Sequence, residues 1–143
     1  MIIHTTSEGI TLAKKLETDS AAFYESLAKA YPEKAEAFQA FAKENKRNIT
    51  NTERVYFGVI SDALEGCYAF NMETDDYTLS TTLAKGAALS KTVSQAVKME
   101  EVIQKFYTQA AEQSKELMAD IPRSFAIIAR KRGERIAKLK EIK

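Results

Sequence analysis

Histidine and cysteine are nearly absent from this sequence, which contains one of each, His4 and Cys67. A single cysteine excludes an internal disulfide, a Cys-x-x-Cys metal knuckle and a rubredoxin-type iron centre. A single histidine excludes any site that needs two imidazoles from one chain. We expect Cys67 to be a buried or inert thiol just beyond a helix end, and His4 to be a solvated side chain in a mobile N-terminal tail.

Glycine and proline are also few, and the net charge is close to zero. Five glycines and two prolines in 143 residues leave few breaks for a many-stranded sheet and favour long helices. The net charge is +1, so no general electrostatic attraction draws the chain to nucleic acid or to an anionic membrane. The sequence has no export signal and no stretch near the roughly 20 apolar residues of a membrane span. It therefore predicts a cytoplasmic protein without nucleic-acid or membrane partners.

The residues that are plentiful predict one all-α domain over residues 1–143. Apolar residues make up 45% of the chain, enough for a packed core. Helical periodicity predicts helices over residues 7–31, 33–65, 90–118 and 122–142, the first capped by Ser7 or Thr6. Residues 67–89 are rich in turn formers, with one short helix expected around 81–85. This length suits a crossover along a bundle, so we expect two helical hairpins joined by a long crossover in a four-helix bundle.

The chain also matches itself. Lys15-Leu16-Glu17 and Phe23-Tyr24 correspond to Lys98-Met99-Glu100 and Phe106-Tyr107 at a constant offset of 83 residues. The stretch Phe38, Phe41, Ala42 corresponds to Phe125, Ile128, Ala129 at an offset of 87 residues. In both hairpins a glutamate shares the inward stripe of its helix with a tyrosine two turns later. A buried glutamate is costly unless it is paired or binds metal, so two at equivalent places need a cause.

With these Glu-x6-Tyr units and the long crossover, the chain resembles the rubrerythrin-like branch of the ferritin-like superfamily. In that family a carboxylate from each of helices one and three, and a Glu-x-x-His from each of helices two and four, hold two irons. Glu17 and Glu100 match the first two positions. The Glu-x-x-His positions are instead occupied by Asn45 and Asn48 on the second helix and by Arg132 and Arg135 on the fourth. The resemblance thus implies the fold but only part of the ligand set.

The replacement residues predict a different occupant of the old metal cavity. Arginine has no lone pair to donate and stays protonated, so it cannot bind iron and repels it. We expect Arg132 and Arg135 to pair with Glu17 and Glu100, with the two asparagines completing the hydrogen bonds, and no cofactor. Tyr24 and Tyr107 are expected as core aromatics bonded to the glutamates. Two acids in a neighbouring register, Glu44 and Glu134, are expected to be solvated.

Three functions stay open on the sequence. The first is a metal-free binding or structural module, which the resemblance implies to be a homodimer. The second is a non-haem diiron oxidoreductase of oxidative stress, acting on peroxide or ferrous iron with a redox partner protein. Its two iron ions would be held by Glu17, Glu100 and further acids such as Glu101, or by another subunit. The third is a pocket for a small anion built on Arg132 and Arg135.

Overall fold

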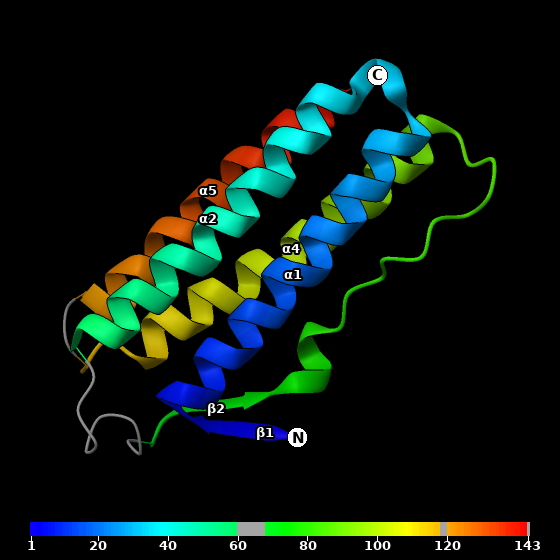
Figure 1. Ribbon diagram of the computed structural model, residues 1–143. Coiled ribbons are helices and arrows are strands. Elements are labelled where there is room, and N and C mark those ends of the chain that lie inside the picture. The colour runs from blue at the N-terminus through cyan, green and yellow to red at the C-terminus, as the bar shows by residue number, and fades with distance from the viewer. Residues whose placement is uncertain (60–67, 118–119, 143) are drawn as a thin grey trace.

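Four long helices lie along one another in the computed structural model, which describes residues 1–59, 68–117 and 120–142 (Figure 1). They are α1 (Thr6–Ala30), α2 (Ala35–Val59), α4 (Leu89–Gln113) and α5 (Asp120–Lys140). The hairpin α1–α2 packs against the hairpin α4–α5. The prediction of four helices in two hairpins is therefore confirmed for the described part of the chain.

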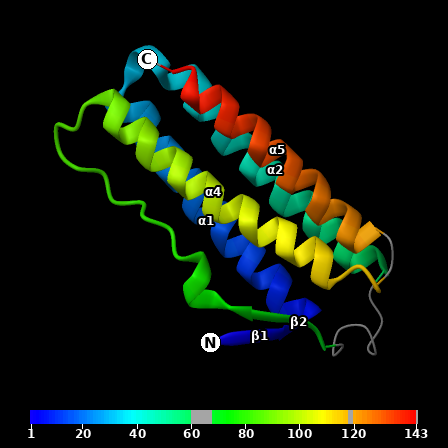
Figure 2. The ribbon, with the colours of Figure 1, turned by 180° about the vertical axis from the view of Figure 1, so that it is seen from behind.

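The connection between the hairpins runs the length of the bundle. Seen from behind, it leaves β2 at one end and reaches the start of α4 at the other (Figure 2). It contains a 3-10 turn, η2 (Thr74–Tyr77), and then continues to residue 88 without helix or strand. The prediction of a short helix around 81–85 is wrong. The carbonyl oxygens of Ser80 and Thr82 instead accept hydrogen bonds from Nε2 of Gln95, both at 3.0 Å. Gly86, with φ 75°, turns the chain into α4.

The helix ends differ from the predicted ones by local capping. α1 begins after Thr5, whose hydroxyl oxygen accepts from the backbone N–H of Glu8 at 3.1 Å while the Glu8 carboxylate accepts from the backbone N–H of Thr5 at 3.0 Å. This capping box, rather than Ser7 or Thr6, starts the helix. Pro32 opens a 3-10 turn, η1 (Pro32–Lys34), ahead of α2. The predicted ends at residues 65 and 118, together with Cys67, lie outside the described residues.

Proline is also accommodated at the start of α5. That helix begins at Asp120, two residues before Pro122, where the first backbone N–H groups have no helical acceptor. α4 ends at Gln113, earlier than expected, and the Ser114 hydroxyl donates to the carbonyl oxygen of Ala110 at 2.6 Å. The stop between the third and fourth predicted helices is therefore real, although its boundaries are shifted.

A two-stranded antiparallel sheet, not predicted from the sequence, closes one end of the bundle. β1 (Ile2–Thr5) pairs with β2 (Tyr68–Glu73), with Ile3 opposite Met72. Ile3 and Met72 are both buried, and Phe70 packs edge-to-face on Phe125 with ring centroids 6.4 Å apart. The expectation of a mobile, solvated N-terminal tail is wrong, because His4 lies half-buried in β1.

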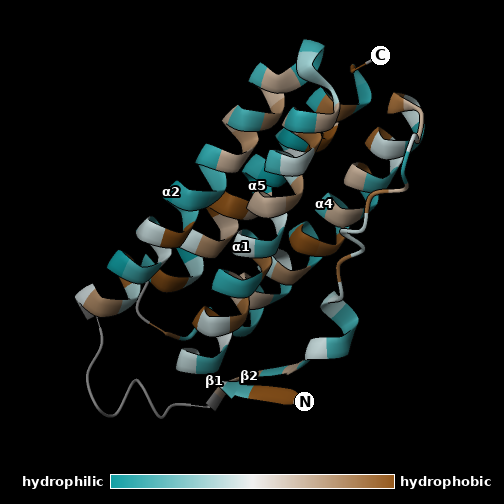
Figure 3. Ribbon diagram, turned by 45° about the vertical axis from the view of Figure 1, so that its right-hand side comes forward, coloured by the Kyte–Doolittle hydropathy of each residue, from teal (hydrophilic) through white to brown (hydrophobic). Residues whose placement is uncertain are grey.

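The apolar faces of the helices turn inward and the polar faces turn outward (Figure 3). Among the described residues, five aromatic side chains are fully buried: Tyr24, Phe38, Phe106, Tyr107 and Phe125. Two of the largest fully buried side chains are nevertheless arginines, Arg132 and Arg135. Within the described residues, no helix is both long enough and apolar enough to cross a membrane.

The sheet packs closely on α1 at Gly9. Adding a methyl group at this position should therefore destabilise the protein. A Cβ at Gly9 would lie 2.9 Å from the Phe70 ring, which is itself held against Phe125. A Cβ at Gly58 in α2 would meet nothing within 4 Å. We expect Gly9→Ala to lower the free energy of unfolding by about 1 kcal/mol, as overpacking outweighs the gain in helix propensity.

The matched control is Gly58→Ala, which removes a helical glycine without a clash. Urea unfolding should show this variant as stable as the parent or more so. Equal stability of the two variants would contradict the packing of Phe70 on α1.

Candidate functional site

The six positions singled out in the sequence meet in the interior of the bundle. Glu17 comes from α1 and Glu100 from α4, each facing the other hairpin. The remaining four come from the other two helices: Asn45 and Asn48 from α2, Arg132 and Arg135 from α5. All six are at most 2% exposed. The structure therefore brings every predicted site residue together, away from solvent.

Arg132 is the centre of the site. Its Nη1 donates to both carboxylate oxygens of Glu100, at 2.7 Å and 2.9 Å. Its Nη2 donates to Oε2 of Glu17. One guanidinium group thus joins the two carboxylates and fixes α5 to both α1 and α4. The cation that bridges the two carboxylates is therefore a side chain of the protein.

Arg135 extends the network toward the surface. Its Nη1 donates to Asn45 Oδ1 at 2.6 Å and to Glu100 Oε1 at 3.1 Å. Its Nη2 donates to Glu44 Oε1 at 2.7 Å. The guanidinium also lies over the rings of Tyr24 and Phe41, 5.4 Å and 5.0 Å from their centroids. Arg135 is therefore held by charge on one side and by aromatic faces on the other.

Glu44 was missed by the sequence analysis. Its side chain is 30% exposed and pairs with Arg135, so the expectation of a solvated flank is wrong for this residue. A helix rotates about 100° per residue, which places Glu44 beside the seam, but the long arginine side chain spans that difference. The position of Glu44 directly before the site residue Asn45 was the one feature of the sequence that could have indicated this contact. Glu134 does lie in solvent, 3.9 Å from the exposed Arg130.

The two tyrosines cross between the hairpins. The Tyr24 hydroxyl, on α1, donates to Glu100 Oε1 on α4 at 2.5 Å. The Tyr107 hydroxyl, on α4, donates to Glu17 Oε1 on α1 at 2.9 Å. Burial first, and the neighbouring carboxylate second, raise the pKa of each phenol well above its usual value. Both tyrosines are therefore hydrogen-bond donors that keep their protons.

The asparagines complete the partners of Glu17. Asn48 Nδ2 donates to Glu17 Oε1 at 3.3 Å, and Asn45 Nδ2 donates to the backbone carbonyl of Glu17 at 3.2 Å. Glu17 thus has amide, phenol and guanidinium donors, and its one cationic partner among the described residues is Arg132. Glu100 has two, Arg132 and Arg135.

Charge within the site is balanced by the protein itself. Burial alone would raise the pKa of Glu100, but Arg132 and Arg135 more than offset this, and the pKa lies below its usual value. Burial alone would lower the pKa of Arg132, but Glu100 and Glu17 raise it well above the usual range. Glu100 and Arg132 are therefore both ionised at neutral pH, each because the other is.

The donor set does not fit the two irons that the ferritin-like resemblance implies. Two guanidinium groups have no lone pairs to offer, and they already engage the two buried carboxylates. In the described ranges, no three His, Cys, Asp or Glu side chains are grouped so that they could hold a metal ion. What this arrangement can do chemically is hold four helices together around an internal ion-pair network.

Comparison with known proteins adds no relative from which a function could be transferred. No protein-family model, no curated protein and no solved structure matches the chain. The site is therefore interpreted from its own geometry.

Removing the central cation gives the first test of this geometry. Arg132→Met leaves Glu17 buried without a cationic partner in the described part of the chain, and we expect the free energy of unfolding to fall by about 3–5 kcal/mol. The control is Arg130→Met on the exposed face of the same helix, which should change stability by less than about 0.5 kcal/mol. Urea unfolding measures both.

A second substitution distinguishes the two carboxylates. In the Arg132→Met background, Glu100 keeps Arg135 as a partner, whereas Glu17 keeps only neutral donors. Glu17→Gln should therefore recover more of the lost stability than Glu100→Gln. The reverse order would show that the pairing of Arg135 with Glu100 is not as described.

The tyrosines predict a loss of stability in alkali. Above about pH 10 the unfolded chain releases phenolic protons that the folded chain keeps, so the free energy of unfolding falls as pH rises. For the variant Tyr24→Phe/Tyr107→Phe, this fall should be shallower by up to about 1.4 kcal/mol per pH unit for each phenol removed. Urea unfolding at a series of pH values gives the slopes, which do not depend on the constant loss of two hydrogen bonds. Parallel slopes for parent and variant would contradict the raised pKa values.

Proposed function

We propose that this chain is a ferritin-like four-helix module, related to the rubrerythrin-like branch, in which arginine side chains have replaced the two iron ions. It acts as a metal-independent binding or structural module rather than as an oxidoreductase. The observation that carries the proposal is the contact of Arg132 with both Glu17 and Glu100.

The order of the helices supports the ferritin-like part of the proposal. Two hairpins joined by one crossover along the bundle are typical of ferritin-like folds (Figure 2). The inward positions also correspond between hairpins, since the Glu-x6-Tyr unit of α1 recurs on α4. These two features together favour a common origin over a chance likeness of amphipathic helices.

The charges support the metal-independent part. A divalent cation between Glu17 and Glu100 would have to displace the guanidinium of Arg132. The displaced group has no route to solvent that keeps its partners, because its side chain is fully buried. Arg135, whose Nη1 also donates to Glu100 Oε1, would repel the metal cation. The network and a metal therefore exclude each other.

The same contacts bear on the anion pocket considered from the sequence. Both guanidinium groups already donate to carboxylates, so an anion in the interior would compete with Glu17, Glu100 or Glu44. An internal anion site, a homodimer and a cytoplasmic location stay predictions.

Iron loading tests the proposal. We expect the chain, exposed to excess ferrous iron in air and then desalted, to retain far less than one iron per chain and to keep its melting temperature. A retained stoichiometry of one or two irons would contradict the proposal and favour the diiron oxidoreductase.

A variant with the family's ligands provides the positive control. The substitutions Asn45→Glu, Asn48→His, Arg132→Glu and Arg135→His together restore a Glu-x-x-His on α2 and on α5. We expect this variant, once circular dichroism shows that it is helical, to retain about two irons per chain. A helical variant without iron would show that these positions are not equivalent to the ferritin-like ligands.

A further inference from the structure

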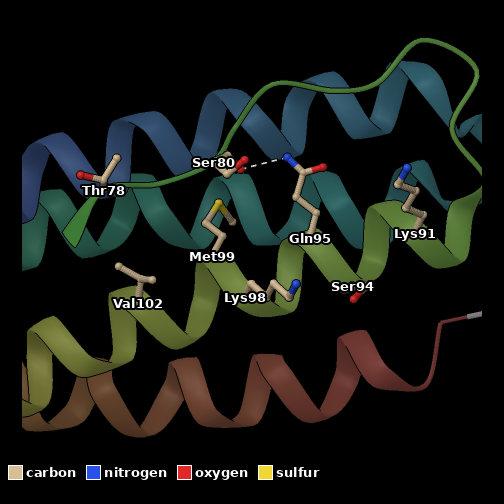
Figure 4. Close-up of a pocket in the computed structure, with 8 residues that line it drawn as sticks. All are labelled: Thr78, Ser80, Lys91, Ser94, Gln95, Lys98, Met99 and Val102. Carbon is tan, nitrogen blue, oxygen red and sulfur yellow. Dashed lines mark hydrogen bonds between the residues drawn. The ribbon is translucent and has the colours of Figure 1, made fainter. Parts of the chain in front are cut away.

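A groove lies on the outside of the bundle, between α4 and the crossover (Figure 4). Its volume is about 500 Å³. One wall is the crossover, with Thr78 and Ser80, and the other is a single face of α4. The α4 residues that line it are Lys91, Ser94, Gln95, Lys98, Met99 and Val102. These positions cover three turns, so the groove is about 16 Å long.

The crossover wall is fixed, although it contains neither helix nor strand here. Figure 4 shows Gln95 reaching from α4 to Ser80, and its Nε2 donates to the carbonyl oxygens of Ser80 and Thr82 at 3.0 Å each. At one end the Tyr77 hydroxyl donates to Gln109. At the other, the Tyr31 hydroxyl donates to the carbonyl oxygen of Ala87 at 2.8 Å. The groove is therefore preformed, and a ligand need not order the wall.

The charge of the groove has one sign. Of the described residues that line it, none is acidic and two are lysines. In the part of the chain that the structure describes, no carboxylate lies within 4 Å of the ammonium group of Lys91 or Lys98, whereas Lys14 and Lys15 on α1 both have acidic partners. The two lysines stand two turns apart on the same face, about 10 Å along the axis. An anion would find two cations that form no ion pair with the described residues.

The floor of the groove is apolar. Met99 is buried below Ser80, Val102 continues the surface toward Thr78, and Lys98 precedes Met99 on the same helix, whereas Lys91 lies beyond Gln95 at the other end. A ligand that uses the whole groove therefore has an apolar body as well as an anionic head. Hydroxyl groups of Ser94 and Thr78 lie along the same groove as further hydrogen-bond donors.

We infer that this groove binds a free amphiphilic anion, with a phosphate or carboxylate head between Lys91 and Lys98 and an alkyl body on Met99 and Val102. The inference goes beyond the metal-independent interior and does not depend on it. The groove uses the outer face of α4, whereas the ion-pair network uses the inner face. Failure of one therefore leaves the other standing.

Decyl phosphate, used below its micelle-forming concentration, is the probe. We expect it to bind the intact chain and to shift the NMR signals of the Met99 methyl group and of the Val102 methyl groups. Inorganic phosphate lacks the apolar body and decyltrimethylammonium lacks the anionic head, so both should bind at least about tenfold more weakly. Equal binding of either compound would overturn the inference.

Variants locate the head group. Lys91→Gln/Lys98→Gln should weaken decyl phosphate binding by about tenfold, since each ion pair contributes a few-fold. The matched control, Lys138→Gln/Lys140→Gln on α5, removes the same charge away from the groove and should leave binding unchanged. Equal loss in both variants would mean that only net charge attracts the probe and would overturn the site.

Vesicles distinguish a free amphiphile from a membrane lipid. The groove can enclose the head and the first part of a chain only if the ligand leaves the bilayer, so the protein should stay in the supernatant with vesicles of phosphatidylcholine and phosphatidylglycerol. Sedimentation with these vesicles that Lys91→Gln/Lys98→Gln abolishes would overturn the free amphiphile as the occupant.

Discussion

Two carboxylates in the middle of a helical bundle must be neutralised, and this requirement shapes the rest of the molecule. Glu17 and Glu100 face each other from α1 and α4, and both are fully buried. One guanidinium group, that of Arg132, forms ion pairs with both carboxylates. Because α5 supplies that group, the second hairpin can dock on the first only where the arginine meets both acids. The position of the hairpins is thus set by a charge as well as by apolar packing.

The two hairpins contribute equivalent tyrosines to the site but not equivalent cations. The tyrosines keep the symmetry of the site, since each donates to the glutamate of the other hairpin. The cations break it, since both arginines lie on α5 while α2 offers amides at the corresponding positions. Two hairpins of similar pattern could otherwise pair in more than one way. The network is incompletely satisfied, because Nε of both arginines lacks a partner among the described residues. Its role is therefore better explained by specifying one arrangement than by adding stability.

The sequence predicted the inward residues because helical periodicity is strong over long segments. Glu17 and Glu100 were located by their spacing, and the two arginines by the positions that the resemblance assigns; all four are buried. The sheet could not be found in this way. β1 has four residues, and its partner Met72 lies 69 positions from Ile3, so no local pattern connects them. Glu44 was missed for another reason. Its helical face was assigned correctly, but a long arginine side chain reaches a neighbour that backbone geometry does not bring inward.

The closed interior has a consequence for where binding takes place. Each charge in the network has its partner inside the protein, and removing one partner leaves the other buried and uncompensated. A ligand that entered between Glu17 and Glu100 would have to break several of these ion pairs at once. The outer face of α4 carries no such cost, because Lys91 and Lys98 are exposed and their ammonium groups meet water. The inner face of the same helix is held by Arg132, Arg135 and two tyrosine hydrogen bonds. The inner face of α4 is thus committed to contacts within the protein, whereas at Lys91 and Lys98 on its outer face an anion can bind without breaking an ion pair of the network.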